Sequence, residues 1–192
     1  AAQVVSYEVP RAMCVVVPVC VAGTLNLNVI GTQQQGWFWD WNVFHDPFTF
    51  VAFFIFFITA TASCKRAPFD LAEAESELVA GFHTEYSGMR LALFFLAEYA
   101  NMIVVSSVAT TLFLGGWLRP FPNVAALAFL DFVPSWTWFL AKSFVFLYFF
   151  VWIRATLPRY RYDQLMRLGW KVLIPLAIIN LVVTGIVKVL IS

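Results

Sequence analysis

The sequence predicts an all-α fold, a polytopic transmembrane helix bundle that forms one domain over residues 1–192. Composition is the first observation: 61% of the residues are hydrophobic and 12% are charged, whereas a soluble domain has about 45–50% apolar and about 25% charged residues. The second observation is that the apolar residues gather in five runs. A helix needs roughly 20 residues to span the hydrocarbon core of a bilayer, and each run is close to that length.

The bounds of the five predicted spans follow from residues that start, bend or end helices. Pro10 and Pro18 are expected to kink the first span. Asp46 fits the cap of the second span, and Pro47 fits its first helical position. Gly115-Gly116 ends the third span. The spans are predicted at about residues 3–25, 47–63, 89–114, 135–153 and 171–191.

The distribution of Lys and Arg predicts the orientation of the chain. Eight of the twelve Lys and Arg residues lie in or beside the loops at 64–88 and 154–170. The loops on the other side hold only Arg119, together with three aspartates. Since cytoplasmic loops carry the excess of positive charge, we expect both cation-rich loops to face the cytoplasm or the mitochondrial matrix. The loop at 154–170 is either a simple anchor of this kind or a docking surface for a partner.

Several kinds of site are not indicated. The net charge of +1 gives no sign of nucleic-acid binding. The three cysteines show neither CxxC nor metal-ligand spacing, so neither a metal nor a disulfide is expected. Without a glycine-rich nucleotide loop or a cluster ligand motif, the chain alone should bind no cofactor, and electrons would come from a partner. The chain begins at Ala1, inside a predicted helix, which favours a fragment or half of a split gene over a cleaved signal peptide.

Residues 64–102 hold six of the eleven acids, next to strongly apolar segments. Such acids are costly near a membrane and usually mark chemistry or ion movement. They are Asp70, Glu73, Glu75, Glu77, Glu85 and Glu98.

The plain alternative for these acids is the solvated face of an amphipathic helix. Asp70 and Glu73 have the spacing of a capping box, and Glu77 follows on the same face. Two features argue against that alternative: Lys65 and Arg66 are too few counter-charges, and Glu98 lies inside an apolar span. Carboxylates crowded in a medium of low dielectric constant are suited to exchanging protons near neutral pH.

The other charges within predicted spans allow more than one interpretation. Glu8 has Arg11 at i+3, so a simple ion pair is the alternative to a functional role. Lys142 is either a buried counter-ion for a carboxylate or a side chain that extends to the interface. His45 and His83 are single histidines, and we assign neither a catalytic role.

One motif is specific. The run KRAPFDLAEAESELVAGF, followed by EYSGM, resembles the signature loop of the quinone-site membrane subunit of respiratory complex I, the proton-pumping NADH:quinone oxidoreductase. The segments AAQVVSYE, LFFLAEY, LFLGGW and IRATLPRYRYDQLMRLGWK are also similar to that family. The resemblance covers the whole chain and implies the fourth to eighth of the family's eight helices.

The resemblance implies a multi-pass subunit of the bacterial plasma membrane or the mitochondrial inner membrane. In this family the subunit joins the other membrane-arm subunits to the peripheral arm, and it forms most of the chamber that ubiquinone or menaquinone enters from the lipid bilayer. NADH, FMN and the iron–sulfur clusters are bound by partner subunits.

The resemblance also implies roles for single residues. The chamber acids are Glu73, Glu75 and Glu77, and the proton path toward the antiporter-like subunits includes Glu8, Glu85 and Glu98. The implied quinone-binding residues are Arg66, Pro68, Phe69, Asp70 and Phe82.

One position departs from the family pattern, and two other classes remain open. Ser63 stands where many members carry glutamate. The first alternative class is the homologous membrane subunit of energy-converting hydrogenases and formate hydrogenlyases, which its partner subunits would distinguish. The second is an independent ion transporter, which would show inverted repeats, and no such repeat is visible.

Overall fold

The computed structural model describes residues 2–64, 69, 88–121, 132–158 and 160–191. All regular structure in these ranges is helical, which confirms the all-α prediction. The long helices are α1 (Ala2–Ala22), α4 (Pro47–Ser63), α6 (Met89–Phe113), α7 (Ser135–Thr156) and α9 (Ile174–Ile191). The short ones are α2 (Leu27–Gln33), η1 (Phe38–Asp40), α3 (Asn42–His45), α8 (Tyr162–Leu168) and the π-helix η4 (Gly169–Leu173).

Within the described ranges, length and hydropathy identify four helices that can cross a membrane: Val5–Ala22, Met89–Phe113, Ser135–Thr156 and Tyr162–Ile191. α4 is equally apolar but has 17 residues. At 1.5 Å per residue it is about 25 Å long, slightly less than the roughly 30 Å of a hydrocarbon core. The chain is therefore an all-α polytopic bundle, with α4 as its shortest long helix.

The last helix begins earlier than the sequence indicates. α8, η4 and α9 form one continuous helix from Tyr162, so much of the predicted loop at 154–170 is helical. The backbone N–H of Arg161 donates to the side-chain oxygen of Gln164 at 3.3 Å, which caps the new start. The sequence pattern does not indicate α8, because its polar residues have the low hydropathy that is typical of a loop.

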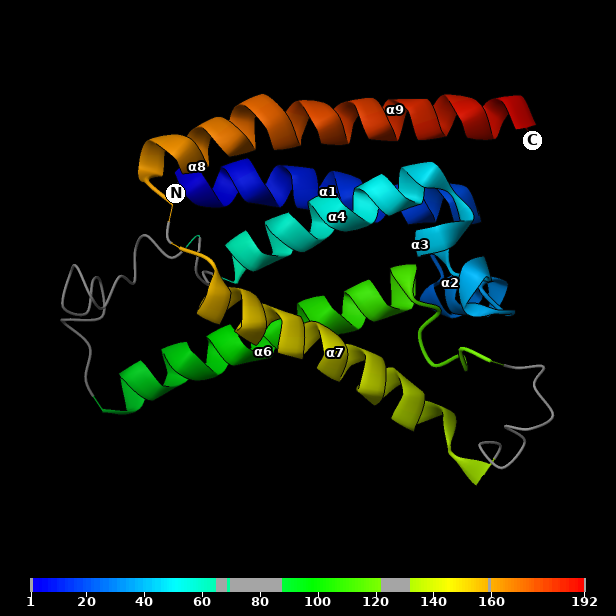
Figure 1. Cartoon of the computed structure of the whole chain (residues 1–192), viewed down its shortest axis with the longest axis horizontal. Helices are drawn as coiled ribbons and strands as arrows, with labels where there is room; N and C mark the ends of the chain where they lie inside the picture. The colour runs from blue at the N-terminus through cyan, green and yellow to red at the C-terminus, as the bar shows by residue number, and fades with distance from the viewer. Residues whose placement is uncertain (1, 65–68, 70–87, 122–131, 159, 192) are drawn as a thin grey trace.

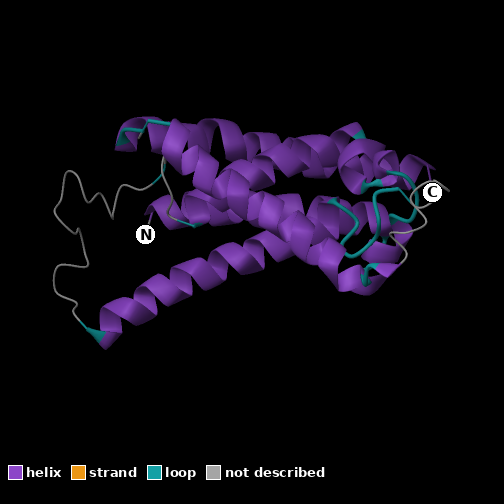
Figure 2. Ribbon diagram, turned by 60° about the horizontal axis from the view of Figure 1, so that its bottom comes forward, coloured by secondary structure: helices purple, strands orange, loops and turns teal. Residues whose placement is uncertain are grey.

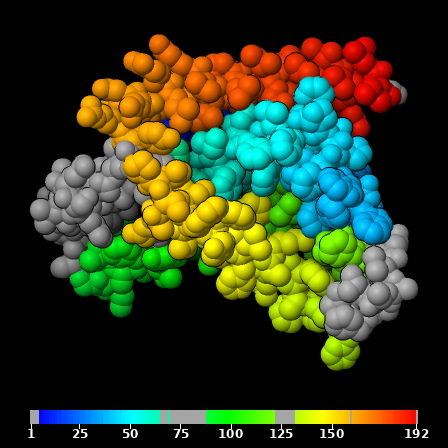
Figure 3. All heavy atoms as spheres, in the orientation of Figure 1, coloured from blue at the N-terminus to red at the C-terminus, as the bar shows by residue number. Residues whose placement is uncertain are grey.

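The helices form two groups. α1, α4 and α9 pack on one another, and α6 packs along α7 (Figure 1). The amino-terminal part of α6 diverges from the rest of the bundle (Figure 2), and Leu93 and Leu96 in it are exposed. In the space-filling view, α4 is seen between α9 and α7 (Figure 3).

Phenylalanine rings join the two groups. Phe53 of α4 lies 5.5 Å from Phe113 of α6 and 5.9 Å from Phe146 of α7, between ring centroids. Phe57 stacks on Phe150 at 5.4 Å. Aromatic pairs at these distances stabilise beyond the area they bury, so this cluster helps hold α4 against the α6–α7 pair.

Candidate functional site

At one end of the bundle, the Ser6–Arg11 segment of α1 meets the last turn of α4, Phe69 and α8; we call this the charged end. α1 and α4 run antiparallel, so the beginning of α1 lies beside the end of α4 (Figure 1). The chain leaves α4 here and enters the acid-rich segment that the sequence predicts to be functional. The charged end therefore contains two of the predicted site residues that the structure describes, Glu8 and Phe69.

Tyr7 is the buried centre of the charged end. Its side chain is 1% exposed, and its hydroxyl donates to the Leu165 carbonyl of α8 at 2.8 Å. The Tyr7 ring centroid lies 5.5 Å from that of Phe69, which in turn lies 5.9 Å from Tyr160. Phe69 is a predicted quinone-binding residue, and the structure holds it between aromatic rings from α1 and from the segment before α8.

Close packing at a glycine reinforces the contact between α1 and α8. A Cβ atom on Gly169 would lie 3.3 Å from the Cβ atom of Ser6, and the Ser6 hydroxyl donates to the Met166 sulfur at 3.8 Å. The π-helix η4 begins at this glycine. π-Helical turns often occur at functional sites, and this one follows the contact with Tyr7 directly.

Glu8 and Arg11 form the ion pair that the sequence offered as an alternative. The Arg11 Nη2 atom lies 3.9 Å from the Glu8 Oε1 atom, and the side chains of Arg11 and Glu8 are 27% and 55% exposed. The Arg11 Nη1 atom also donates to the Ser63 hydroxyl at 2.8 Å. The guanidinium thus contacts the carboxylate on its own helix and the last turn of α4.

Glu98 lies half-buried in α6, on the face that continues inward with Met102 and Val105, which are 5% and 6% exposed. Asn101, one turn later, donates from its amide to the sulfur of Cys64 at 3.8 Å. Cys64 directly follows Ser63 and caps α4. α1 and α6, which carry the predicted proton-path residues Glu8 and Glu98, therefore both reach the same end of α4.

Lys142 lies in a different environment, which we call the carbonyl end. Its ammonium donates to three backbone carbonyls of the turn after α6, those of Leu114 at 2.6 Å, Gly116 at 3.2 Å and Leu118 at 2.7 Å. Three N–H groups are all that an ammonium has. The Trp41 ring centroid lies 4.3 Å from the nitrogen. The sequence suggested a carboxylate partner or an extended side chain, whereas the structure shows a lysine 8% exposed and held by carbonyls.

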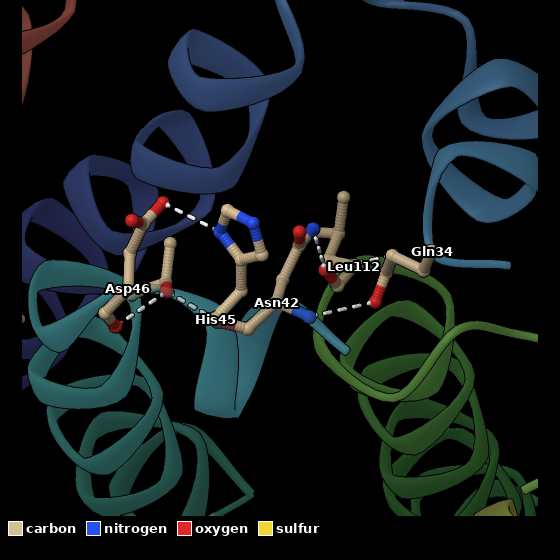
Figure 4. Close-up of polar contacts among 6 residues, drawn as sticks. Gln34, Asn42, His45, Asp46 and Leu112 are labelled. Atoms are coloured by element: carbon tan, nitrogen blue, oxygen red, sulfur yellow. Dashed lines mark hydrogen bonds and ion pairs between the residues drawn. The ribbon is translucent and has the colours of Figure 1, made fainter. Parts of the chain in front are cut away.

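Gln34 and Asn42 complete the carbonyl end, and the sequence pattern singled out neither. The Gln34 oxygen accepts the backbone N–H groups of Asn42 at 3.1 Å and Gly115 at 2.9 Å, while its nitrogen donates to the Thr111 carbonyl at 3.2 Å. Figure 4 shows Gln34 and Leu112 beside Asn42, whose amide donates to the Leu112 carbonyl at 2.8 Å. Nothing in the run of three glutamines distinguishes Gln34 from its neighbours.

The other predicted site residues lie outside the part of the chain that the structure describes, and their roles stay predictions. They are Arg66, Pro68, Asp70, Glu73, Glu75, Glu77, Phe82 and Glu85. In the described ranges, no group of three or more His, Cys, Asp or Glu residues is arranged to hold a metal ion.

Comparison with known proteins identifies the family. The family model described as NADH dehydrogenase matches residues 1–185. An H-type subunit of the NADH-quinone oxidoreductase of Koribacter versatilis is 50% identical over 185 residues, which are 96% of this chain and 52% of that protein. An H-type subunit of the same enzyme from Geobacter metallireducens is 52% identical over 184 residues, 96% of this chain and 51% of the relative.

A third relative, the H-type subunit from Paraburkholderia xenovorans, is 49% identical over 195 aligned positions, which cover 96% of this chain and 52% of the relative. The chain spans about half the length of the curated relatives it matches. Because the family model matches nearly the whole chain, the protein belongs to the NADH dehydrogenase family.

Proposed function

We propose that the chain is part of the membrane subunit of a proton-translocating NADH:quinone oxidoreductase in an energy-transducing membrane. The observation that carries this proposal is the identity of about one half, over 96% of the chain, with proteins named as the H-type subunit of NADH-quinone oxidoreductase. Its partners would be the other membrane-arm and peripheral-arm subunits, the lipid bilayer and quinone. NADH, FMN and the iron–sulfur clusters would be bound by those partner subunits.

The charged end is the proposed site of quinone binding. An apolar quinone entering from lipid needs aromatic and apolar contacts with a few polar groups to orient it. Phe69, held between Tyr7 and Tyr160, supplies the aromatic contact. In this proposal Arg66, Pro68, Asp70 and Phe82 complete the lining, with Glu73, Glu75 and Glu77 beside it.

Proton translocation is the second part of the proposal. Glu8, Glu85 and Glu98 would pass the effect of quinone reduction toward the pumping subunits as changes in proton occupancy. The approach of α1 and α6 to the same end of α4 supports this role, since a proton path requires acids on neighbouring helices. Ser106, buried two turns beyond Glu98, supplies a hydroxyl along the same face.

Replacing Arg66 tests the quinone site. In this proposal Arg66 pairs with Asp70 or Glu73, and the stranded partner of a buried ion pair costs about 3–5 kcal/mol. Arg66→Ala should therefore lower quinone reduction by the assembled complex more than Arg159→Ala does. Electron transfer from NADH to a water-soluble acceptor should be unchanged in both variants. Equal, wild-type quinone rates in the two variants would contradict this site.

Replacing Glu98 tests the proton path. Glutamine keeps the shape of the side chain but cannot ionise, so Glu98→Gln should slow both quinone reduction and proton pumping in reconstituted vesicles. The complex should still assemble and still reduce an artificial acceptor. Pumping and quinone reduction at the wild-type rate would show that the path does not pass through Glu98.

A further inference from the structure

Arg11 is a single cation shared between two helices. Its Nη2 atom faces the Glu8 carboxylate at 3.9 Å, and its Nη1 atom donates to the Ser63 hydroxyl at 2.8 Å. A guanidinium has several donors in one plane, so one arginine can serve two acceptors. Arg11 therefore connects Glu8, through an ion pair, with the last turn of α4, through a hydrogen bond.

Arg11 places a cation beside the carboxyl end of α4. The last carbonyls of a helix carry partial negative charge, which a nearby cation stabilises. α4 has no basic residue in its last turn, whereas α7 has Arg154 and α9 has Lys188 in that position. Because α1 runs antiparallel to α4, Arg11 brings a guanidinium to this end.

The last turn of α4 leads into the proposed quinone site. Cys64 caps α4 and is 1% exposed, and Phe69 follows shortly after it. Phe69 contacts Tyr7, which precedes Glu8. One short segment of α1 therefore contacts the chain before the quinone-binding run, through Arg11 and Ser63, and again within it, through Tyr7 and Phe69.

We propose that Arg11 is a positioning residue of the quinone site: by bonding Ser63 while paired with Glu8, it sets where the chain leaves α4 toward Phe69. This inference rests on the proposed function, and it assigns to Arg11 a role distinct from binding quinone or carrying protons. It predicts that Arg11 and Ser63 act through the same bond. Loss of that bond should loosen the end of α4 and weaken quinone binding.

Cys64 is a native probe of the end of α4. In the purified complex, we would measure by mass spectrometry the rate at which a small maleimide labels Cys64. Arg11→Gln and Ser63→Ala should each raise this rate several-fold, whereas Ser63→Thr, which keeps the hydroxyl, should not. Arg154→Gln, which removes an exposed cation from the last turn of α7, is the matched control. The buried Cys14 thiol in α1 is the internal reference and should label at the wild-type rate in every variant.

Quinone kinetics test the consequence. Arg11→Gln and Ser63→Ala should each raise the KM for a short-chain quinone, by up to about tenfold, the range expected for loss of one typical hydrogen bond, with a smaller change in kcat. The double variant should be no worse than Arg11→Gln alone, because both changes remove one bond. Arg11→Lys should recover part of the loss, and reduction of an artificial acceptor should be unchanged.

Unchanged labelling of Cys64 in both Arg11→Gln and Ser63→Ala would overturn the inference whatever the kinetics. Faster labelling with a wild-type KM, in a complex where Arg66→Ala lowers quinone reduction, would also overturn it, because the link would exist without positioning the site. If faster labelling came with wild-type quinone kinetics in the Arg66 and Glu98 variants as well, the proposed function itself would have failed.

Discussion

At the carbonyl end, Lys142 and Gln34 bond backbone groups of the turn after α6, whereas at the charged end Arg11 bonds side chains of α1 and α4. Gly115 and Gly116 allow this turn, since their φ angles of 68° and 52° lie in the left-handed region. A Cβ atom on Gly115 would lie 3.1 Å from the Trp41 ring. Backbone partners of this kind cannot move without unfolding the turn.

The contacts of Arg11 at the charged end have more freedom. The Glu8–Arg11 pair is partly exposed and 3.9 Å long, and Arg11 reaches α4 through one hydroxyl. Long, partly exposed pairs contribute little to stability, and side-chain rotation is enough to rearrange them. The comparison indicates that backbone bonds fix the carbonyl end, whereas the contacts of Arg11 with Glu8 and Ser63 at the charged end can respond to a change of charge. Polar substitutions at the carbonyl end should therefore lower stability, and those at the charged end should mainly change activity.

Lys142→Met should have the largest effect on stability. Methionine keeps the apolar stem but removes the three donors, which leaves the carbonyls of Leu114, Gly116 and Leu118 without their ammonium partner. An unsatisfied buried acceptor costs about 1–3 kcal/mol, so a total loss of about 3 kcal/mol or more is expected. Thermal unfolding of the detergent-solubilised protein measures it. Lys188→Met, at an exposed lysine of α9, is the control. Equal melting temperatures for the two variants would show that the carbonyl end does not hold the bundle.

Gln34→Leu should have the next largest effect. It removes the acceptor for the backbone N–H groups of Asn42 and Gly115 and the donor to Thr111. We expect a loss of about 2 kcal/mol in the free energy of unfolding, measured in the same way. Gln35→Leu, one residue later and exposed, should change it by much less. A Gln34 variant as stable as the Gln35 variant would contradict the assignment of Gln34 to the carbonyl end.

Substitutions at two helical glycines should have the smallest effect. Gly169 lies at the charged end, and Gly185 in α9 is its control. Gly185→Ala meets nothing within 4 Å and should stabilise α9 by about 0.5–1 kcal/mol, since alanine favours helix. Gly169→Ala should lack this gain, because its Cβ atom would lie 3.3 Å from Ser6. Moving α8 away from α1 should also disturb the Tyr7 bond and lower quinone reduction. Equal stabilisation by both variants, with normal quinone reduction, would show that α1 and α8 tolerate a wider spacing.

The fold class and most of the long helices followed from local pattern, because long apolar runs in water-excluding surroundings have few structures available to them. Pro47 at the first position of α4, and the end of α6 just before Gly115-Gly116, were predicted from single residues. The start of α8 was not, since its polar residues have no apolar periodicity, and its cap depends on Gln164 bonding back to Arg161. Likewise, the Glu8–Arg11 pair followed from i+3 spacing, but the Ser63 contact joins residues far apart in the chain.

The sequence by itself determined that this is an all-α polytopic membrane protein with its acids concentrated after α4, and its signature run pointed to its family. Only the tertiary structure decided that Lys142 is held by carbonyls, that Gln34 joins the start of α3 to the turn after α6, and that Tyr7 and Arg11 meet Phe69, Ser63 and α8. The physical reason is that hydropathy and helix signals act over neighbouring residues, whereas a polar side chain inside a bundle takes its partner from whichever helix packing brings within hydrogen-bond distance.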